Sequence, residues 1–519
     1  MKHDGAAVLA ADDTRGSFLR GLERLGNKLP NPAVLFLILF MVLALCSYVL
    51  QLADVSAVNP KTNDLIHVKS LISAEGLDWI LTNLIKNYIN FPPLGMIIVL
   101  TFGLGVASET GFLQTLIHHS MHNIPARYVT LAVVFISLMS HIASDAAIVI
   151  MPPLAAMLFY SLGRHPLVGF ACSLAAIYSG FTANILIVTT DVLLSGITTQ
   201  AVRIVDPNLT VSPIDNWYFM SFAVLYLTAV TTFITEKFVE PRLGVYDPAH
   251  AHGDLTLPDV SDAEKKALRH SLYAALGYIA VVFLLAFPDN GLLRNPQTHS
   301  LLGSPLLRGV IPLLCGFLLT IGITYGISLK KIKNADDMIQ CMTNAVKGLA
   351  GFMVMAFFIA QFIAAFAWTN LASVIAMNGA MFLQSIGMTG LPALLCFMLF
   401  GQFMGIFMSS GSAVWALLST VFVPMFMLLG YHPAFIQAAF RAGDGALNTV
   451  ALVNPFLPLF LEIIRRYKKD SGIGTYLSLM MPYAMGFLIM WYALFIFWYC
   501  MGWPTGPGIP QHLPVQGVI

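Results

Sequence analysis

Few charged side chains interrupt the apolar runs of this chain, and four of them could do chemistry: Asp145, Asp191, Arg441 and Asp444. Inserting a charge at mid-membrane costs roughly 3 kcal/mol, so such residues are functional candidates by default. Arg441 and Asp444 are three residues apart, which puts them on one helix face where they can pair, as a working site or as a structural ion pair. Asp191 has no cation near it in the sequence. We expect Asp145, Asp191 and Asp444 to take part in ion coupling, with a purely structural role as the alternative for Asp191.

Two asparagines accompany these acids: Asn184 precedes Asp191 by seven residues, and Asn448 follows Asp444 by four. Asparagine side chains and unwound backbone carbonyls supply the oxygen ligands that a hard cation takes. A buried carboxylate can equally load and release a proton. We therefore expect Asn184 and Asn448 to contribute to ion coupling, and the residues leave Na+ and H+ equally open.

An aromatic residue, Trp415, follows the small polar run Ser409-Ser410-Gly411-Ser412. Its indole could stack on an aromatic substrate ring, and ordinary packing is the equal alternative. His118, His119 and His122 also cluster, but without acidic or cysteine companions they do not predict a metal site.

The composition places these residues in a membrane. The chain has 519 residues, of which 57% are hydrophobic and 10% charged, with a net charge of +1. Soluble domains carry about a quarter charged residues, and a spanning helix needs ~20 apolar residues, so the apolar runs predict one polytopic all-α bundle. The near-zero net charge argues against nucleic acid as a partner. Six widely spaced cysteines predict neither disulfides nor a metal site.

Lysine and arginine collect in four segments, which the positive-inside rule places in the cytoplasm. These are the N-terminus, 237–269, 330–333 and 465–469, so the N-terminus is expected inside and the uncharged C-terminus outside. Nine spans connect these markers: 32–53, 93–110, 166–200, 214–235, 270–288, 309–330, 348–370, 433–464 and 475–500.

Two apolar segments are left over, 128–160 and 389–429, and each must return to the side from which it came. Small polar residues interrupt both, at 140–145 and 409–412. Irregular backbone at membrane depth is tolerated where it lines a cavity. The segments are therefore predicted to be re-entrant hairpins, with two kinked spans each as the alternative.

The two leftover segments begin an internal repeat. Gly163-Arg164-His165-Pro166 follows the first and Gly430-Tyr431-His432-Pro433 follows the second. Ser144 precedes His165 by 21 residues and Ser412 precedes His432 by 20. The loop charges predict that the first unit enters the membrane from the inside and the second from the outside, so the two units are inverted relative to each other. Inverted repeats with broken helices are typical of secondary transporters.

Motifs for other functions are absent from the sequence. No GxxxxGK[ST], HExxH or GxSxG is present, so we expect neither a P-loop ATPase nor an enzyme. A channel is the other class; it predicts unsaturable flux without ion coupling, whereas two closed hairpins favour alternating access.

The sequence resembles the p-aminobenzoyl-glutamate transporter (AbgT) family of bacterial inner-membrane proteins along essentially its whole length. Within that family it looks closer to folate-catabolite importers than to drug exporters. The motifs that carry the resemblance are Ser144-Asp145-Ala146-Ala147, Gly180-Phe181-Thr182-Ala183-Asn184, Thr189-Thr190-Asp191, Ala367-Trp368-Thr369-Asn370, Gly411-Ser412-Ala413-Val414-Trp415, Arg441-Ala442-Gly443-Asp444 and the closing Gly502-Trp503-Pro504.

The resemblance implies nine spans plus two re-entrant hairpins, a homodimer, and an inner scaffold with a mobile outer core. It also implies no cofactor other than a bound Na+. Val414 and Leu452 depart from relatives that have Asn or Gln and Pro there, so a side-chain ligand at 414 is in doubt and Asn454-Pro455 could carry the second break. The family's site residues correspond to Asp191, Ser412, Trp415, Pro433, Arg441 and Asp444, with Asp444 and Asn448 resembling its sodium ligands.

We expect a secondary transporter of p-aminobenzoyl-glutamate, driven by Na+ or H+, with a proton-coupled exporter of sulfonamide-type compounds as the alternative. Arg441 would hold one carboxylate, Trp415 would stack the aryl ring, and the backbone at Ser410, Gly411 and Ser412 would bind the second carboxylate. The expected parts are an N-terminal cytoplasmic segment (1–31), scaffold spans (32–110), the first repeat (128–200), a scaffold span (214–235), a cytoplasmic linker (236–269), scaffold spans (270–330), a span with an outer amphipathic segment (348–388), the second repeat (389–464), the last span (475–500) and a periplasmic tail (501–519).

Overall fold

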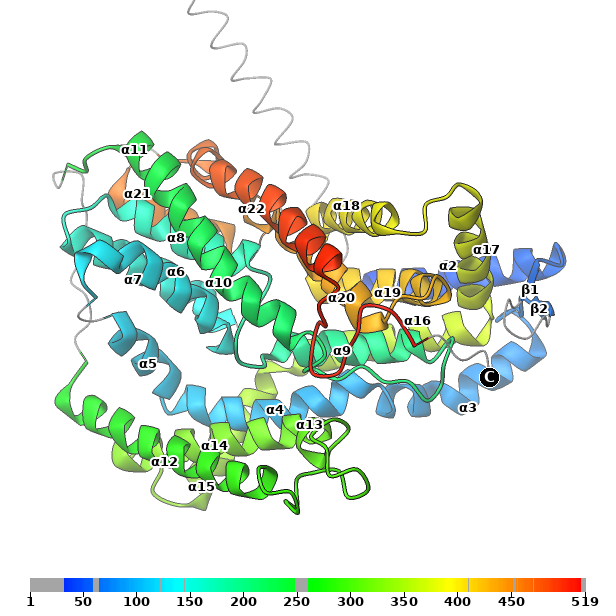
Figure 1. Ribbon diagram of the computed structural model, residues 1–519, viewed down its shortest axis with the longest axis horizontal. Helices are drawn as coiled ribbons and strands as arrows, with labels where there is room; N and C mark the ends of the chain where they lie inside the picture. Colours follow the sequence, from blue (N-terminus) through cyan, green and yellow to red (C-terminus); the bar gives the residue numbers. More distant parts are fainter. Residues whose placement is uncertain are drawn as a thin grey trace, which may run out of the picture.

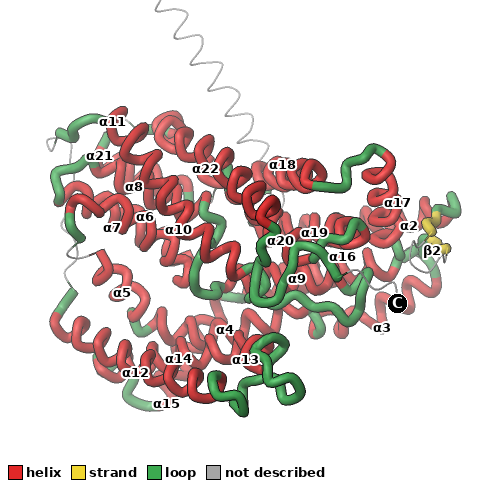
Figure 2. Tube along the Cα trace, viewed as in Figure 1, coloured by secondary structure: helices red, strands yellow, loops and turns green. Residues whose placement is uncertain are grey.

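The described part of the chain is mainly helical, with one two-stranded sheet (Figures 1 and 2). Nine helical segments among the described residues are long and apolar enough to cross a membrane. The predicted all-α polytopic fold is thus confirmed. The computed structural model describes residues 32–58, 65–121, 124–143, 145–247, 260–408, 410–450, 454, 456–469 and 471–514.

The helices outside the two repeats are here called the scaffold, and their close contacts depend on small residues. Gly103 lies against the backbone of Cys315, and Gly322 lies against the backbone of Ala107, so α4 and α14 pack with their backbones nearly touching. The scaffold elements are α2 (Pro32–Leu52), α3 (Ala74–Ile89), α4 (Pro92–Glu109), α5 (Phe112–Met121), α10 (Trp217–Ile234), the π turn η3 (Thr235–Val239), α11 (Glu240–Leu243), α12 (Asp262–Ala286), α13 (Pro305–Arg308), α14 (Val310–Ser328), α15 (Ala335–Gly348), α16 (Ala350–Trp368), α17 (Leu371–Ser385) and α22 (Ile473–Met501).

The only strands among the described residues lie between α2 and α3. They are β1 (Ser56–Val58) and β2 (Leu65–His67), which pair antiparallel with Ser56 opposite His67. In Figure 1 this sheet lies at the far right, beside the ends of α2 and α3.

Each repeat consists of a hairpin followed by an interrupted helix. In the first, α6 and α7 form the hairpin, and α8 packs against both. In the second, α18 packs on α20, and α19 packs on α9 of the first repeat, so the repeats interlock. The elements are η1 (Ala126–Tyr128), α6 (Val129–Met139), η2 (Ser140–Ala143), α7 (Asp145–Ser161), α8 (Pro166–Ser179) and α9 (Thr189–Val202), then α18 (Leu391–Phe407), α19 (Gly411–Leu428), α20 (Pro433–Gly445), η5 (Asn448–Val450) and α21 (Leu457–Tyr467).

The repeated His-Pro pair has the same structural role in both copies. Nδ1 of His165 accepts a hydrogen bond from the Leu167 amide at the start of α8, and Nδ1 of His432 accepts one from the Ala434 amide at the start of α20, each at 3.2 Å. The proline follows at the first helical position, where its missing N–H costs nothing. The preceding glycines, Gly163 and Gly430, both have positive φ, of 71° and 92°. A four-residue signal therefore makes the same sharp turn and helix start twice.

The helices that span by length are not the same set as the nine predicted crossings. The hairpin arms Ala126–Ala143 and Gly411–Leu428 are among the nine segments that are long and apolar enough to cross a membrane. By contrast, the predicted spans 166–200 and 433–464 are each divided into two shorter helices. The first break runs through Phe181 and Thr182, which have φ of 42° and 57°. In the second break, Asn454 is described and accepts from the Phe456 amide, while 452 and 455 lie outside the described residues.

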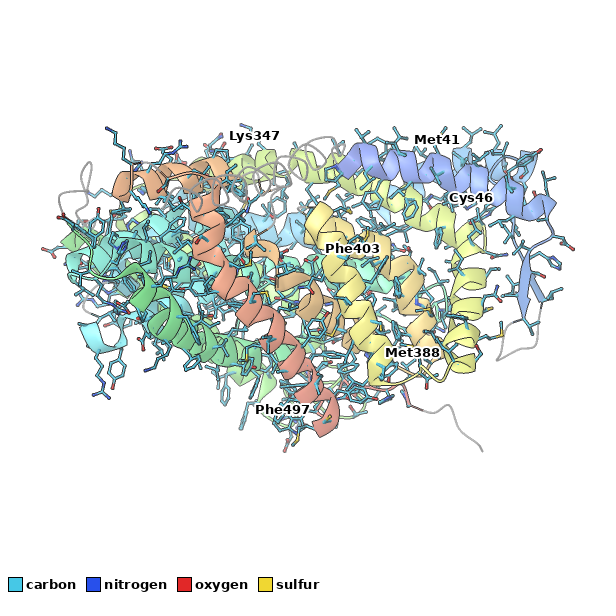
Figure 3. All side chains as sticks on the ribbon, turned by 90° about the horizontal axis from the view of Figure 1, so that it is seen from above. Met41, Cys46, Lys347, Met388, Phe403 and Phe497 are labelled. Atoms are coloured by element: carbon cyan, nitrogen blue, oxygen red, sulfur yellow. The ribbon has the colours of Figure 1, made fainter. Side chains whose placement is uncertain are left out.

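Hydrogen bonds join the predicted cytoplasmic segments 237–269 and 465–469, and also join the helices that flank 237–269 and 330–333. His270, near the start of α12, is hydrogen-bonded to Ser328 at the end of α14, and the Tyr246 hydroxyl donates to the Tyr467 carbonyl at the end of α21. In Figure 1, α11, α21 and the start of α12 all lie toward the left. Figure 3 shows the long α22, which runs past the hairpins to Phe497 at its end.

Candidate functional site

A buried ion pair joins the two interrupted helices. Nη1 of Arg441 in α20 donates to Oδ1 of Asp191 in α9 at 2.5 Å, and their side chains are 0% and 8% exposed. Oδ2 of Asp191 accepts from the Val188 amide at 2.8 Å, so the carboxylate also caps its own helix. Nη2 of Arg441 donates to the Thr182 hydroxyl at 3.2 Å, while its Nε has no hydrogen-bond partner among the described residues.

This geometry corrects the pairing predicted from sequence. Arg441 and Asp444 share a helix, but the arginine pairs with Asp191. Asp444 is 2% exposed, and its Oδ1 lacks a hydrogen-bond partner within the described residues. Its carboxylate lies between the arms of the second hairpin: Oδ1 is 2.5 Å from where a Cβ on Gly405 would be, and Oδ2 is 3.0 Å from the corresponding point on Gly411. The two glycines leave room for this acid.

The two asparagines differ in their surroundings. Oδ1 of Asn448 points to the same place as Asp444, 3.9 Å from the Cβ position of Gly405. By contrast, Asn184 donates through Nδ2 to the carbonyls of Leu138 and Met139 at the end of α6, and accepts from the Leu186 amide. Asp444 and Asn448 therefore lie together, as the predicted oxygen set for a cation requires. The side chain of Asn184 bonds to the first hairpin and to the Leu186 amide, and its part in ion coupling stays a prediction.

The tip of the second hairpin lies against the break in the first repeat. Gly411 begins α19, and the ring of Phe181 is 2.8 Å from its Cβ position. Ser410 caps α19 through its hydroxyl, which also lies 3.1 Å from the hydroxyl of Ser412. The predicted substrate residues Ser410, Gly411 and Ser412 are thus brought next to the break. Asp145 begins α7 in the first hairpin; its side chain lies outside the described residues.

Two predicted substrate residues do not face this region. Trp415 is fully buried, its ring stacks on Phe440 at 4.7 Å, and its Nε1 donates to the Thr198 hydroxyl at 2.9 Å. One face of the indole is therefore covered by Phe440, and the stacking of the other face on substrate stays a prediction. Pro433 is the first residue of α20, eight residues or about 12 Å along the helix from Arg441. It starts the helix, and its contact with substrate stays a prediction.

A cavity of about 170 Å³ lies beside the ion pair, between the first hairpin and the first break. His141, Tyr178, Phe181, Thr190 and Asn448 are among its lining residues. His141 is 9% exposed, and its Nε2 has no hydrogen-bond partner in the described part of the chain. The cavity therefore combines aromatic walls with one unsatisfied polar atom, Nε2 of His141, as expected where a small molecule binds.

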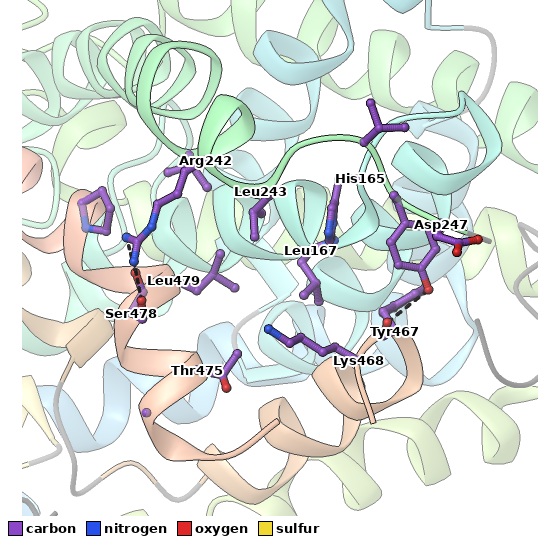
Figure 4. A pocket seen from close by; sticks show the side chains of 15 residues that line it. His165, Leu167, Arg242, Leu243, Asp247, Tyr467, Lys468, Thr475, Ser478 and Leu479 are labelled. Atoms are coloured by element: carbon purple, nitrogen blue, oxygen red, sulfur yellow. Dashed lines mark hydrogen bonds between the residues drawn. The ribbon is translucent and has the colours of Figure 1, made fainter. Parts of the chain in front are cut away.

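A larger cavity, of about 670 Å³, shares no lining residue with the first and lies where α8, α11, α21 and α22 meet (Figure 4). Arg242 points into it and donates to the Ser478 hydroxyl at 2.7 Å. Burial, reinforced by the charge of Lys468, lowers the pKa of His165 to about 4. None of the predicted site residues lines this cavity.

Sequence reasoning missed His141, Phe181 and Thr182 as site residues. His141 stood in the polar hairpin tip, and Phe181-Thr182 stood in the Gly-Phe-Thr-Ala-Asn stretch, so both signals were present. What the pattern could not indicate was that the left-handed backbone at Phe181 and Thr182 turns them toward Arg441.

Comparison with known proteins agrees with this architecture. A model of the AbgT transporter family matches residues 17–513. The chain is 44% identical over 498 residues to the p-aminobenzoyl-glutamate transport protein of Escherichia coli (strain K12), covering 96% of this chain and 97% of that protein.

Two solved structures are similar in fold as well as sequence. The YdaH transporter of Alcanivorax borkumensis matches with a TM-score of 0.88 and 33% identity, covering 92% of this chain and 100% of that one. MtrF of Neisseria gonorrhoeae, described as illuminating a class of antimetabolite efflux pumps, matches with a TM-score of 0.89 and 37% identity over 95% of this chain and 100% of its own. The chain belongs to the AbgT family of membrane transporters.

Proposed function

We propose that this transporter carries p-aminobenzoyl-glutamate, or a similar aryl-amide dicarboxylate, across the bacterial inner membrane and couples that movement to Na+ or H+. The observation that carries the proposal is the buried Asp191–Arg441 pair between the two interrupted helices, with the nearby Asp444 Oδ1 lacking a hydrogen-bond partner among the described residues. The 44% identity to the Escherichia coli p-aminobenzoyl-glutamate transport protein supports the substrate.

The arrangement of charge supports ion coupling. Asp444 forms no ion pair with the described residues, and a buried carboxylate that no cation neutralises is costly; binding Na+ or a proton removes that cost. Asp444 and Asn448 would supply oxygen ligands to Na+, and Asp444 alone could take a proton. Arg441 would bind a substrate carboxylate, which would either replace Asp191 as its ion-pair partner or bind beside it.

Two further features belong to the proposal. The basic segments at 237–269, 330–333 and 465–469 support a cytoplasmic N-terminus and a periplasmic C-terminus. The homodimer is carried over from the family resemblance.

A second candidate is proton-coupled export of sulfonamide-type antimetabolites. It is favoured by the 37% identity and TM-score of 0.89 to MtrF. The same acids would then exchange inward protons for outgoing drug.

Transport by the purified protein in proteoliposomes distinguishes these candidates. Labelled p-aminobenzoyl-glutamate is offered with an inward Na+ or H+ gradient in separate experiments, and an unlabelled sulfonamide is the competitor. Saturable accumulation driven by one gradient supports import and names the ion. No accumulation, together with sulfonamide leaving preloaded vesicles against a proton gradient, supports export. Unsaturable flux without coupling would contradict both.

A further inference from the structure

The small cavity beside the ion pair contains a buried polar atom that the proposed coupling does not use. His141 lies in η2 at the tip of the first hairpin, and Nε2 of its ring has no hydrogen-bond partner in the described residues. Its side chain lines the cavity. A buried nitrogen without a partner is destabilising, so the position calls for a ligand or a water molecule that bonds to it.

The surroundings of the ring favour Nε2 as an acceptor. The imidazole lies near the backbone of Ile177, which is in the last turn of α8. Carbonyl groups in the last turn of a helix lack intrahelical partners and accept readily from a side chain. A neutral imidazole that donates through one nitrogen accepts through the other. The matching ligand group is therefore a hydrogen-bond donor.

The size and walls of the cavity suit one aromatic ring. Its volume is about 170 Å³, and cavities of about 150 Å³ in protein cores hold benzene. The rings of Tyr178 and Phe181 and the aliphatic side chain of Ile148 line it. Thr182, on the same wall, accepts a hydrogen bond from Arg441, so the cavity adjoins the guanidinium.

We infer that this cavity is the subsite for the aryl group of the substrate. The para-amino group donates to Nε2 of His141, the ring lies against Phe181, and the glutamyl end extends past Thr182 toward Arg441. This assignment rests on the proposed function and specifies which end of the substrate each repeat recognises. It also gives Trp415 a packing role, because its indole is covered by Phe440 and lines no part of the cavity.

The test compares ligands that differ only in the para substituent. p-Aminobenzoyl-glutamate and p-methylbenzoyl-glutamate are titrated into the purified full-length protein by calorimetry. A site built to accept a hydrogen bond rejects a matched group that cannot donate one. We expect wild type to prefer the amino compound by about tenfold, the factor that corresponds to one good hydrogen bond.

Variants at His141 show whether this residue is the acceptor. His141→Phe keeps a ring of similar shape without nitrogen and should reduce the preference to about twofold or less, while His141→Gln keeps a polar atom and should retain part of it. His67→Phe makes the same change on the exposed strand β2 and should keep the full preference.

The outcomes separate this inference from the proposed function. Equal affinity of wild type for the two compounds, or an undiminished preference in a folded His141→Phe protein, overturns the aryl subsite and leaves the transport proposal standing. No binding of either compound by wild type overturns both. Should His141→Phe fail to fold, His141→Gln decides: a preference below that of wild type supports the assignment, and a preference equal to that of wild type overturns it.

Discussion

Arg441 and Asp191 are 250 residues apart in the chain, yet Nη1 of the arginine lies 2.5 Å from Oδ1 of the aspartate. The pair connects α20 of one repeat with α9 of the other, at the end of each where the helix approaches its break. Both side chains are buried, so each charge depends on the other for compensation. If one repeat moved relative to the other, either this ion pair would break or the two side chains would have to move together.

Removing one partner should cost more than removing both. Arg441→Ala leaves Asp191 as an uncompensated buried charge, and we expect it to lower the free energy of unfolding by about 3–5 kcal/mol. The double variant Arg441→Ala/Asp191→Asn removes both charges and should recover much of that loss, although neither protein should transport. Thermal unfolding of the purified proteins gives the comparison. A double variant less stable than Arg441→Ala would contradict a compensating pair.

Asp444 should be required for ion-driven transport but not for folding. Asp444→Asn keeps the size of the side chain and removes the charge that would bind Na+ or a proton. We expect gradient-driven uptake to fall by on the order of tenfold or more, since coupling energies are typically a few kcal/mol. Glu462→Gln on the exposed surface of α21 is the matched control. Full coupled uptake by Asp444→Asn would exclude the acid as the coupling group.

Two glycines one turn apart in α18 test the space around Asp444. A methyl group on Gly405 would be 2.5 Å from Oδ1 of Asp444, whereas one on Gly401 would meet nothing closer than 3.5 Å. Gly405→Ala must therefore displace the carboxylate, and we expect coupled uptake to fall by about tenfold. Gly401→Ala should leave uptake within about twofold of wild type. Equal uptake by the two variants would show that the position of the carboxylate is not critical.

The sequence predicted the parts of the fold that depend on local signals. The turn and helix start at Gly430-Tyr431-His432-Pro433 could be predicted because glycine, histidine and proline each act within a few residues. The hairpins followed from polar residues in apolar segments. The partner of Arg441 could not be predicted, since i,i+3 spacing indicates only what a side chain can reach along its own helix.

The candidate site was predicted by residue type more reliably than by orientation. Asp444 and Asn448 are found together, as expected for two residues four apart in the sequence. Asn184 and Trp415 are buried as predicted for site residues, but their polar groups are bonded to Met139 and Thr198. Which way a buried side chain faces depends on helices distant in sequence, and composition does not record it.

His165 should make stability depend on pH. Its folded pKa is about 4, below its ordinary value, so the unfolded chain binds more protons between these values and stability falls as the pH drops from about 7 toward 4. Because the ring is partly exposed, we expect a loss of about 1–2 kcal/mol. His165→Asn keeps an acceptor for the Leu167 amide and should flatten the dependence. Melting temperatures at pH 5 and 7.5 test this; equal slopes for the two proteins would contradict it.

Trp415 and Phe181 offer two positions for the aryl ring of the substrate, and substitutions separate them. Trp415→Phe keeps the stack on Phe440 and loses the bond from Nε1 to Thr198, so stability should fall by about 1 kcal/mol. Its affinity for p-aminobenzoyl-glutamate should stay within about twofold, because Phe440 covers one face of the indole and Trp415 does not line the cavity. Phe181→Leu removes the ring that lines the cavity, and we expect an affinity loss of up to about tenfold, the range measured for aromatic pairs. A larger loss in Trp415→Phe than in Phe181→Leu would place the aryl group on the indole instead.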